Sequence, residues 1–305
     1  MTSTDADSSH PVVLPAPATT MRKREAEEWI LVLTAEDIAS ALIRRDGVFG
    51  VEVASRDASA AAEIISAWRA ERAERARRMA VPVPRAATPV ETAASYVFAL
   101  GLLAFHLGLE YSTHRREFLD AGRSQAALVL DGEVWRLATA LTLHADLPHV
   151  LGNTLFGGFF LAAVAGRLGI GVGVLCFVTT GTLGNLANAI YYGSAHSSVG
   201  ASTGVFGLVG VLAGLAAWQR HQTAAPGRGA WVAFAAGLAI VAMLGSGGPR
   251  VDFSAHLFGL VAGGLTGLLV ARPFAFRSRL TPIGQSIAAT SAVAFVLGAW
   301  ALALR

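Results

Sequence analysis

The chain has 305 residues, of which 53% are hydrophobic and only 15% are charged. Soluble domains carry charges on about a quarter of their residues, so this composition excludes an ordinary soluble protein and indicates a polytopic membrane protein. The formal net charge is +3. Because the arginines cluster near apolar segments, we interpret this excess as a topology signal and expect no nucleic-acid partner. The single cysteine, Cys176, excludes an intrachain disulfide.

The N-terminal part is more polar than the rest. The first twenty residues lack the basic and apolar regions of a cleaved signal peptide, and residues 1–22 are rich in Ser, Thr, Pro and Ala, which predicts a disordered tail. We expect residues 23–80 to form a small cytosolic βαβα domain. Its predicted elements are a strand in EWILVLT, a short helix from Thr34 to about Gly47, a strand in VFGVEVA and a helix from Asp57 to Arg78.

This N-terminal domain has two possible roles. A solubilising cap is the favoured interpretation, because runs of charge are usually solvated faces. A regulatory or partner-binding domain is the alternative. The basic segment RAERAERARR at its end could also contact anionic lipid headgroups, although its glutamates dilute that signal.

Beyond a linker at residues 81–92, apolar segments long enough to cross a bilayer follow one another. We predict an all-α polytopic membrane bundle, with a core of six helices in residues 93–275 and one additional transmembrane helix in residues 276–305. The expected spans are about 93–111, 149–166, 169–190, 200–218, 230–246, 252–270 and 284–304.

The distribution of arginines predicts the topology. Short connections near Arg167, Arg220 and Arg272 lie on the same side as the Arg-rich segment before the first span. The positive-inside rule therefore favours a cytoplasmic N-terminus. The segment at about 112–148 is long and partly apolar, and we expect a structured loop in or on the outer interface.

The stretch VGASTGVFGLVG combines hydroxyls and glycines where a membrane segment would prefer leucine. Ser202 is flanked by Gly200 and Gly204 at the expected start of the fourth span. The first backbone N–H groups of a helix have no intrahelical partner and can stabilise a developing oxyanion. Taken alone, such a serine is more often a packing or capping residue.

A second polar residue, His256, lies in the apolar segment SAHLFGLVAGGLTG. Gly259, Gly263 and Gly267 recur every four residues after it, which permits close approach of another helix. A histidine inside a span is either hydrogen-bonded in the bundle or part of a functional site.

The third cluster is HADLPHVLGN, with His144, His149 and Asn153. His149 and Asn153 are four residues apart and share one helix face. Histidines at this spacing can ligate zinc, but there is no HExxH pattern and no carboxylate at a ligand spacing, so we expect no metal. Under the predicted topology Asn153, Ser202 and His256 enter the membrane from the same side, which favours a nucleophilic site.

Four motifs together resemble the rhomboid intramembrane serine proteases. They are EVWRLATALTLH, HVLGN, GASTGVFG and AHLFGLVAG, and they occur in the family's order over about residues 93–275. The resemblance implies that Ser202 is the nucleophile and His256 the general base of a dyad without an acidic member.

The resemblance also implies supporting roles. His149, Asn153 and the Ser202 N–H would bind the oxyanion, and Phe206 would pack against the imidazole. Asp252 is expected to cap the sixth span rather than to approach His256. Further support is expected from Gly200, from Gly259 and Gly263 in the helix contact, from Trp135 and Arg136 in the family's membrane-embedded loop, and from His144 beneath that loop.

The sequence departs from the family's pattern at two places, the segment AVAGRLG and Thr203. The segment AVAGRLG lacks the acidic residue that many members carry at the inner end of the second span. Thr203 stands where glycine is common and is expected to narrow the substrate cleft. The segment GSGGPRVD would be the family's lid over the site.

The predicted function is hydrolysis of peptide bonds in or near transmembrane helices, without cofactor or metal. The partners would be transmembrane protein substrates and the lipid bilayer, in a bacterial inner membrane. Family members prefer small residues at the cleaved bond. The alternatives are a catalytically inactive rhomboid-like protein that binds membrane helices and, less favoured because the sequence has no inverted repeat, a transporter or channel.

Overall fold

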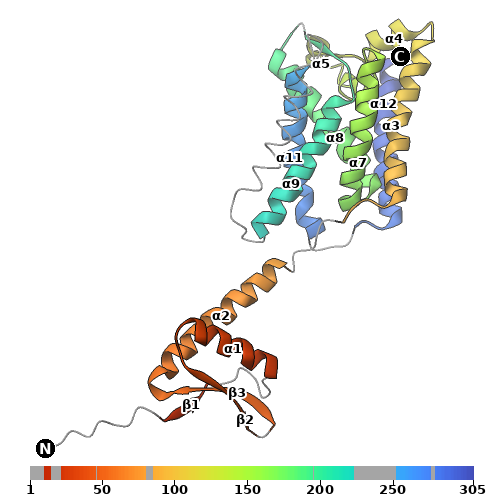
Figure 1. Cartoon of the computed structure of the whole chain (residues 1–305). Helices are drawn as coiled ribbons and strands as arrows, with labels where there is room; N and C mark the ends of the chain where they lie inside the picture. Colours follow the sequence, from red (N-terminus) through yellow and green to blue (C-terminus); the bar gives the residue numbers. More distant parts are fainter. Residues whose placement is uncertain are drawn as a thin grey trace, which may run out of the picture. The chain divides into compact units, whose positions relative to one another are not determined.

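The computed structural model of the chain describes residues 10–14, 22–45, 47–79, 85–194, 196–222, 252–275 and 279–305. Contacts between residues divide it into two compact units, Met1–Val81 and Pro82–Arg305 (Figure 1). The first unit mixes helices with a small sheet and the second is a helical bundle. The prediction of a helical membrane bundle with a small N-terminal α+β region is confirmed.

The N-terminal unit is a three-stranded antiparallel sheet covered by two helices. Strand β3 is central, and the sheet order is β1-β3-β2. Trp29 and Leu33 from the first helix pack with Val51 and Val53 of β3 and Ile65 of the second helix. The elements are β1 (Pro11–Val13), α1 (Lys23–Ala35), β2 (Ser40–Arg45), β3 (Val48–Ala54), the 3-10 turn η1 (Ser55–Asp57) and α2 (Ala58–Met79).

The predicted βαβα order is wrong in its first two elements. EWILVLT lies in helix α1, not in a strand, and its buried residues Ala26, Trp29 and Leu33 follow the three- and four-residue spacing of a helix, whereas Leu31 is 71% exposed. The preceding KREAEE consists of strong helix formers, and these decide the local structure.

The predicted short helix from Thr34 to Gly47 is also wrong, because Ser40–Arg45 forms strand β2. In the sequence, the pair Asp46–Gly47 favours a hairpin, and Gly47 has a φ of +82° that suits glycine. Strand β2 pairs antiparallel with β3. The prediction of a disordered tail over residues 1–22 is wrong for Pro11–Val13, which forms β1 and pairs with β3.

Six helices of the described residues are long and apolar enough to cross a membrane. The expected spans agree with them to within a few residues. The predicted fifth span, 230–246, lies outside the described residues. The six helices are α3 (Pro89–Glu110), α7 (Leu147–Leu168), α8 (Ile170–Tyr192), α9 (Ser202–Gln222), α11 (Phe253–Ala275) and α12 (Pro282–Ala303).

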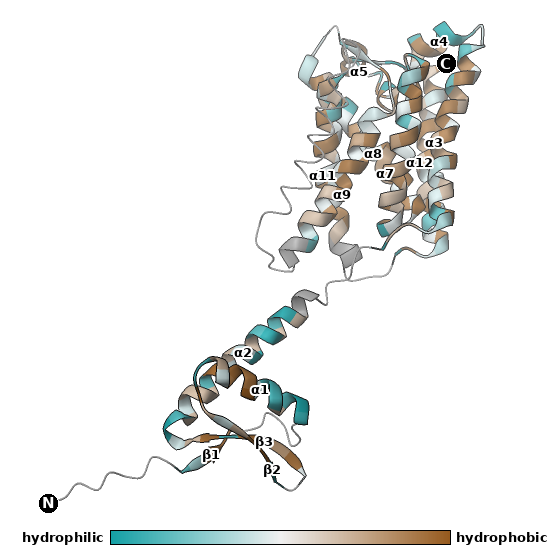
Figure 2. Cartoon of the chain, viewed as in Figure 1, coloured by the Kyte–Doolittle hydropathy of each residue, from teal (hydrophilic) through white to brown (hydrophobic). Residues whose placement is uncertain are grey.

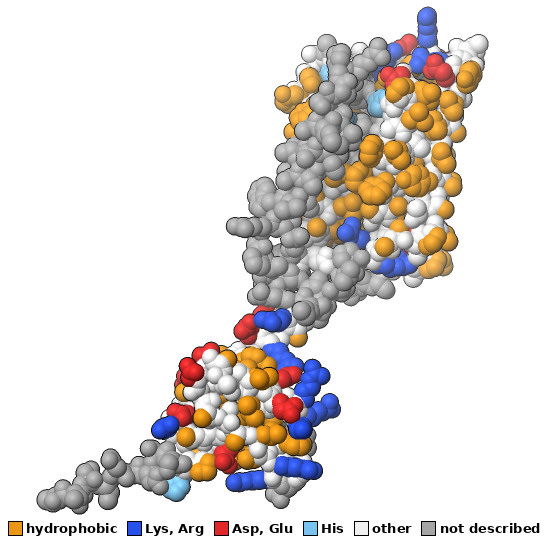
Figure 3. Space-filling model, viewed as in Figure 1, with side chains coloured by type: hydrophobic (Ala, Val, Ile, Leu, Met, Phe, Trp, Pro, Cys, Tyr) orange, Lys and Arg blue, Asp and Glu red, His pale blue; other side chains and the backbone are white. Residues whose placement is uncertain are grey.

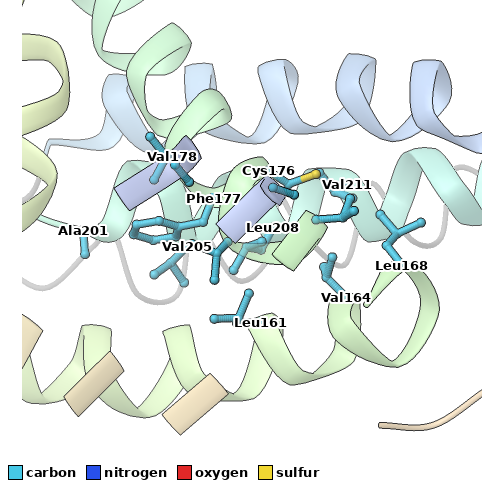
Figure 4. Packing of buried hydrophobic residues seen from close by; sticks show 14 residues of the cluster. Leu161, Val164, Leu168, Cys176, Phe177, Val178, Ala201, Val205, Leu208 and Val211 are labelled. Atoms are coloured by element: carbon cyan, nitrogen blue, oxygen red, sulfur yellow. The ribbon is translucent and has the colours of Figure 1, made fainter. Parts of the chain in front are cut away.

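The bundle buries apolar side chains between α7, α8 and α9. Leu161 and Val164 of α7, Phe177 of α8 and Val205 and Leu208 of α9 point toward one another (Figure 4). The helices are apolar along much of their length (Figure 2), and many of their large apolar side chains are exposed. On the face seen in Figure 3 charged side chains gather toward the ends of the bundle. This distribution is that of a membrane-spanning protein.

Helices α9 and α11 touch through their backbones. A Cβ atom added to Gly259, Gly263 or Gly267 would overlap a backbone carbonyl oxygen of α9, belonging to Thr203, Gly207 or Val211. The predicted glycine stripe therefore faces α9. No residue larger than glycine fits at these positions without moving one helix, so the stripe fixes the distance between α9 and α11.

We expect Gly263→Ala to lower the free energy of unfolding by about 1–3 kcal/mol, the usual cost of overpacking. The matched control is Gly101→Ala on α3, where an added Cβ has no neighbour within 4 Å; it should be neutral or raise stability by up to about 1 kcal/mol. Thermal unfolding of the purified protein in detergent measures both. Equal effects of the two substitutions would contradict the close backbone packing.

Candidate functional site

The segment before α7 is structured, as the sequence predicted. It contains α4 (Arg115–Gly122), β4 (Ser124–Gln125), α5 (Ala126–Leu130), α6 (Arg136–Thr139) and the 3-10 turn η2 (Ala140–Thr142). Strand β4 pairs with β5 (Ser197–Ser198) of the connection between α8 and α9. We call residues 112–146 loop one.

Arg136 holds loop one together. Its side chain is buried, pairs with Glu133 at 2.6 Å, and donates to the carbonyl oxygens of Asp120 and Arg123. Trp135 directly precedes α6, and its buried indole Nε1 has no hydrogen-bond partner among the described residues. Asn185 of α8 donates to the carbonyl oxygen of Leu137 at 2.8 Å and fixes loop one to the bundle.

The end of loop one holds the backbone that leads into α9. The N–H of Gly200 donates to the carbonyl oxygen of Ala140 at 2.9 Å. The N–H of the next residue, Ala201, donates to Nε2 of His144 at 3.4 Å. Two consecutive amides are thus fixed immediately before Ser202.

Ser202 is the first residue of α9. Because the first N–H groups of a helix lack intrahelical partners, its N–H and those after it are available to an anion. Gly200 has a φ of +144°, and a Cβ on it would lie 2.7 Å from Cε1 of His149 and 3.4 Å from Oγ of Ser202. The His149 ring and the Ser202 hydroxyl therefore both border Gly200.

His256 lies in the first turn of α11 and packs against α9. Its ring centroid is 4.4 Å from that of Phe206, one turn after Ser202. The sequence suggested that Thr203 narrows the substrate cleft. In the structure its buried side chain packs instead between Gly184 of α8 and Gly259 of α11.

The buried polar atoms near this point that lack hydrogen-bond partners in the described part of the chain include Nδ2 of Asn153 and Nδ1 of His256. Buried polar groups are nearly always paired, so an unpaired one calls for an explanation such as a ligand or a catalytic role. Asn153 lies one turn after His149 on α7. We call the end of the bundle that holds Ser202, His256, His149 and Asn153 the site end.

Residues 131–273 match the family model described as Rhomboid domain, and this range includes Ser202, His256, His149 and Asn153. This match supports a rhomboid family protein. Together with the six apolar helices it supports an integral membrane protein.

Curated relatives agree with the family. The chain is 34% identical to "Rhomboid protease GluP" of Bacillus subtilis, over 39% of this chain and 24% of the relative. It is 30% identical to "Rhomboid-like protease 1" of Toxoplasma gondii, over 48% and 51%. It is 35% identical to "RHOMBOID-like protein 1" of Arabidopsis thaliana, over 45% and 34%. The chain thus spans about half or less of the length of these relatives.

In the rhomboid domain Asp252 caps α11, as the sequence favoured. Its Oδ1 accepts from the N–H of Ala255 and the hydroxyl of Ser254. Its Oδ2 contacts Nδ2 of Asn188 at 2.8 Å and Nε2 of His196 at 2.6 Å. Burial raises the pKa of this carboxyl, but these bonds outweigh burial and hold it below its ordinary value. Asp252 is therefore occupied by other partners than the His256 ring.

The sequence reasoning missed two histidines. His106 of α3 is buried, and its ring centroid is 6.0 Å from that of His144; the signal for it was a histidine inside the first span. His196 lies flat on Tyr192, with centroids 3.9 Å apart, and bonds to Asp252. Nothing in its local sequence indicated that pairing. The predicted lid, residues 245–252, lies outside the described residues except for Asp252.

The His144 ring is neutral in the folded rhomboid domain. Burial, together with the neighbouring His149 and His106, lowers the pKa of His144 to about 3. A neutral ring suits its bond, because Nε2 accepts from the Ala201 N–H and must carry no proton. Among the described residues, no group of three or more His, Cys, Asp or Glu is arranged to hold a metal ion.

The pKa of His144 predicts a stability that depends on pH. In the unfolded chain histidine has a pKa of about 6.5, so as pH falls the unfolded state takes up a proton before the folded state does. The contribution of His144 to the free energy of unfolding is therefore complete above about pH 6.5 and is lost as pH falls toward about 3. We expect a loss of up to about 2 kcal/mol between pH 6.5 and pH 5. His144→Gln, which does not titrate, should reduce the fall in melting temperature over this range.

His114→Gln is the control for this prediction, because the His114 side chain is 68% exposed. It should leave the pH dependence of melting as in the wild type. If His144→Gln melts with the same pH dependence as the wild type, His144 is not held neutral in the folded protein.

Proposed function

We propose that the chain is an intramembrane serine endopeptidase that cleaves peptide bonds in or near transmembrane helices of other membrane proteins. The observation that carries this proposal is that His149 and the Ser202 hydroxyl both border Gly200, while His256 packs against Phe206 one turn after Ser202. The relatives named as proteases support the same reaction.

The proposed reaction is acyl transfer through Ser202. His256 takes the proton of the Ser202 hydroxyl as its Oγ forms a bond to the substrate carbonyl carbon. The protonated imidazole gives this proton to the leaving nitrogen, the C–N bond breaks, and an acyl-enzyme remains. Water, deprotonated by the same imidazole, then releases the carboxylate product and regenerates the serine.

The oxyanion of the tetrahedral intermediate would be bound by three groups. These are the Ser202 N–H at the start of α9, Nδ2 of Asn153 and the ring of His149. The positive end of the α9 dipole adds to their effect. The unpaired state of Asn153 Nδ2 among the described residues supports this role, since it leaves a donor free for substrate.

Catalysis by a dyad requires another means of orienting the imidazole. In a triad an acid holds the histidine. Here the Asp252 carboxylate is bonded to other groups, so contact with Phe206 and the backbone contact at Gly259 would orient His256 instead.

The proposed topology has the site end facing away from the cytoplasm. Arg167 and Arg279 lie at the other end of the bundle, where Arg279 pairs with Glu91 and with the carbonyl oxygen of Gly166. The positive-inside rule then favours a cytoplasmic N-terminus in a bacterial inner membrane. Substrate helices would unwind at the site, because an intact helix hides its carbonyls.

Ser202→Ala and His256→Ala should each lower cleavage of a co-expressed, tagged single-pass protein by about 10⁴-fold or more, since dyad members act as a unit. Labelling of the wild type by a fluorophosphonate should disappear with Ser202→Ala. Ser198→Ala and His114→Ala are the matched controls and should cleave normally. A wild type that binds the tagged protein and neither cleaves it nor reacts with the probe would identify an inactive, helix-binding rhomboid.

Asn153→Ala should lower kcat by about 10²–10³-fold with little change in KM, as expected when one oxyanion donor is lost. It should not destabilise the fold, because Asn153 Nδ2 has no partner among the described residues. Asn185→Ala is the contrast: Asn185 Nδ2 donates to Leu137, and its loss should cost about 1–3 kcal/mol of stability. Normal turnover by Asn153→Ala would remove this residue from the oxyanion site.

A further inference from the structure

Helix α12 lies outside the segment that matches the rhomboid domain, which ends at residue 273, yet it is fixed to the bundle at both ends. Far from the site end, Gln285 donates to the carbonyl oxygen of Leu168 at 2.8 Å and accepts from the N–H of Val172 at 3.1 Å. Gly171 lies directly against the Gln285 backbone, because a Cβ there would overlap its carbonyl oxygen. An extra helix docked this closely requires an explanation.

At the site end α12 is fixed by Trp300. The indole is 9% exposed, and its Nε1 donates to Oγ1 of Thr142 at 3.1 Å. Its ring centroid is 5.1 Å from that of Phe118 and 5.9 Å from that of Phe105. A Cβ on Gly122 would lie 2.5 Å from the ring, so glycine makes room for it. Figure 1 shows the end of α12 beside α4.

The partner of Trp300 belongs to the turn that holds the loop before Ser202. Thr142 is the last residue of η2, and its hydroxyl also donates to the carbonyl oxygen of Thr139 at 2.8 Å. The first residue of the same turn, Ala140, accepts from the N–H of Gly200. Two residues after Thr142, His144 accepts from the N–H of Ala201. The contacts therefore run from α12 through η2 to the residues adjoining the nucleophile.

We propose that Trp300 is a positioning residue of the active site, which fixes η2 and thereby the Gly200–Ser202 backbone. This inference rests on the proposed role of Ser202 as the nucleophile. It gives α12 a function. This helix, which follows the rhomboid domain, holds loop one against the backbone that carries Ser202 and its N–H, one of the proposed oxyanion donors.

An aromatic residue near a helix end can also be a simple anchor at the membrane interface. Trp300 differs from such an anchor in two respects. Its ring is buried against loop one, and its N–H is bonded to a loop residue instead of facing headgroups. Phe295 of the same helix is 53% exposed and provides the comparison.

The test compares Trp300→Phe, Trp300→Ala and the control Phe295→Ala in the full chain. Each is labelled with a fluorophosphonate, and the rate constant is measured separately from the final fraction labelled, which reports the folded population. Trp300→Phe keeps the ring packing and loses the N–H, so the rate constant should fall about threefold. Trp300→Ala should lower it about tenfold, with the final fraction nearly unchanged. Phe295→Ala should match the wild type.

Thr142→Val removes the acceptor of the same bond. This variant tests the proposal even if Trp300→Ala folds poorly. It should lower the rate constant at least as much as Trp300→Phe does, because the Thr142 hydroxyl also donates to Thr139. The double substitution should be no slower than Thr142→Val alone. Additive effects would mean that the bond between Trp300 and Thr142 is not what positions the site.

Hydrogen exchange separates this inference from the proposed function. In Trp300→Ala the amides of Gly200 and Ala201 should exchange about tenfold faster than in Phe295→Ala, as their acceptors lose support. Faster exchange together with slower labelling supports the proposal, and normal exchange or normal labelling overturns it. If wild-type protein does not label at all, the nucleophilic role of Ser202 fails, and exchange alone decides whether Trp300 holds the loop.

Discussion

The backbone contact between α9 and α11 is the constraint on which the rest of the bundle depends. In a bilayer the lipid is as apolar as the helix surface, so close packing has to supply much of the association energy. Gly259, Gly263 and Gly267 supply it by meeting the α9 backbone directly. The same contact fixes the distance between the two helices that begin near Ser202 and His256.

Loop one and the connection between α8 and α9 have to fold together. Their polar backbone groups lie at one end of an apolar bundle, where unpaired groups are costly. Strand β4 pairs with β5, Arg136 satisfies two carbonyls, and His144 accepts an amide. The β4–β5 pairing and the His144 bond join loop one to the connection before α9, and the Arg136 bonds link parts of loop one to each other. The site end is therefore held by several elements together.

The sequence was informative where one periodicity dominates. The spans and the glycine stripe followed from composition and from four-residue spacing. The stripe and the six spans that fall on described residues agree with the structure. In the N-terminal unit EWILVLT is apolar in every position, so its period is ambiguous, and the helix formers before it decide the outcome. The pair Asp46–Gly47 in the sequence favours a hairpin and was the signal for β2 and β3.

Pairings across the chain were not predictable in the same way. His196 and Asp252 are far apart in sequence, and so are Trp300 and Thr142. The residues around each of them contain no pattern that predicts its partner. Short motifs find residues that need a fixed neighbour spacing, such as His149 and Asn153. They do not find contacts that exist only once the helices have packed.

The one-residue connection between α7 and α8 has a consequence for biogenesis. Gly169 alone joins the two helices, with a φ of +91°, so they form a tight helical hairpin. The carbonyl of Leu168 and the amide of Val172 are satisfied by Gln285, which is made more than a hundred residues later. These two groups therefore lack their partner until α12 has been synthesised and has docked on the bundle.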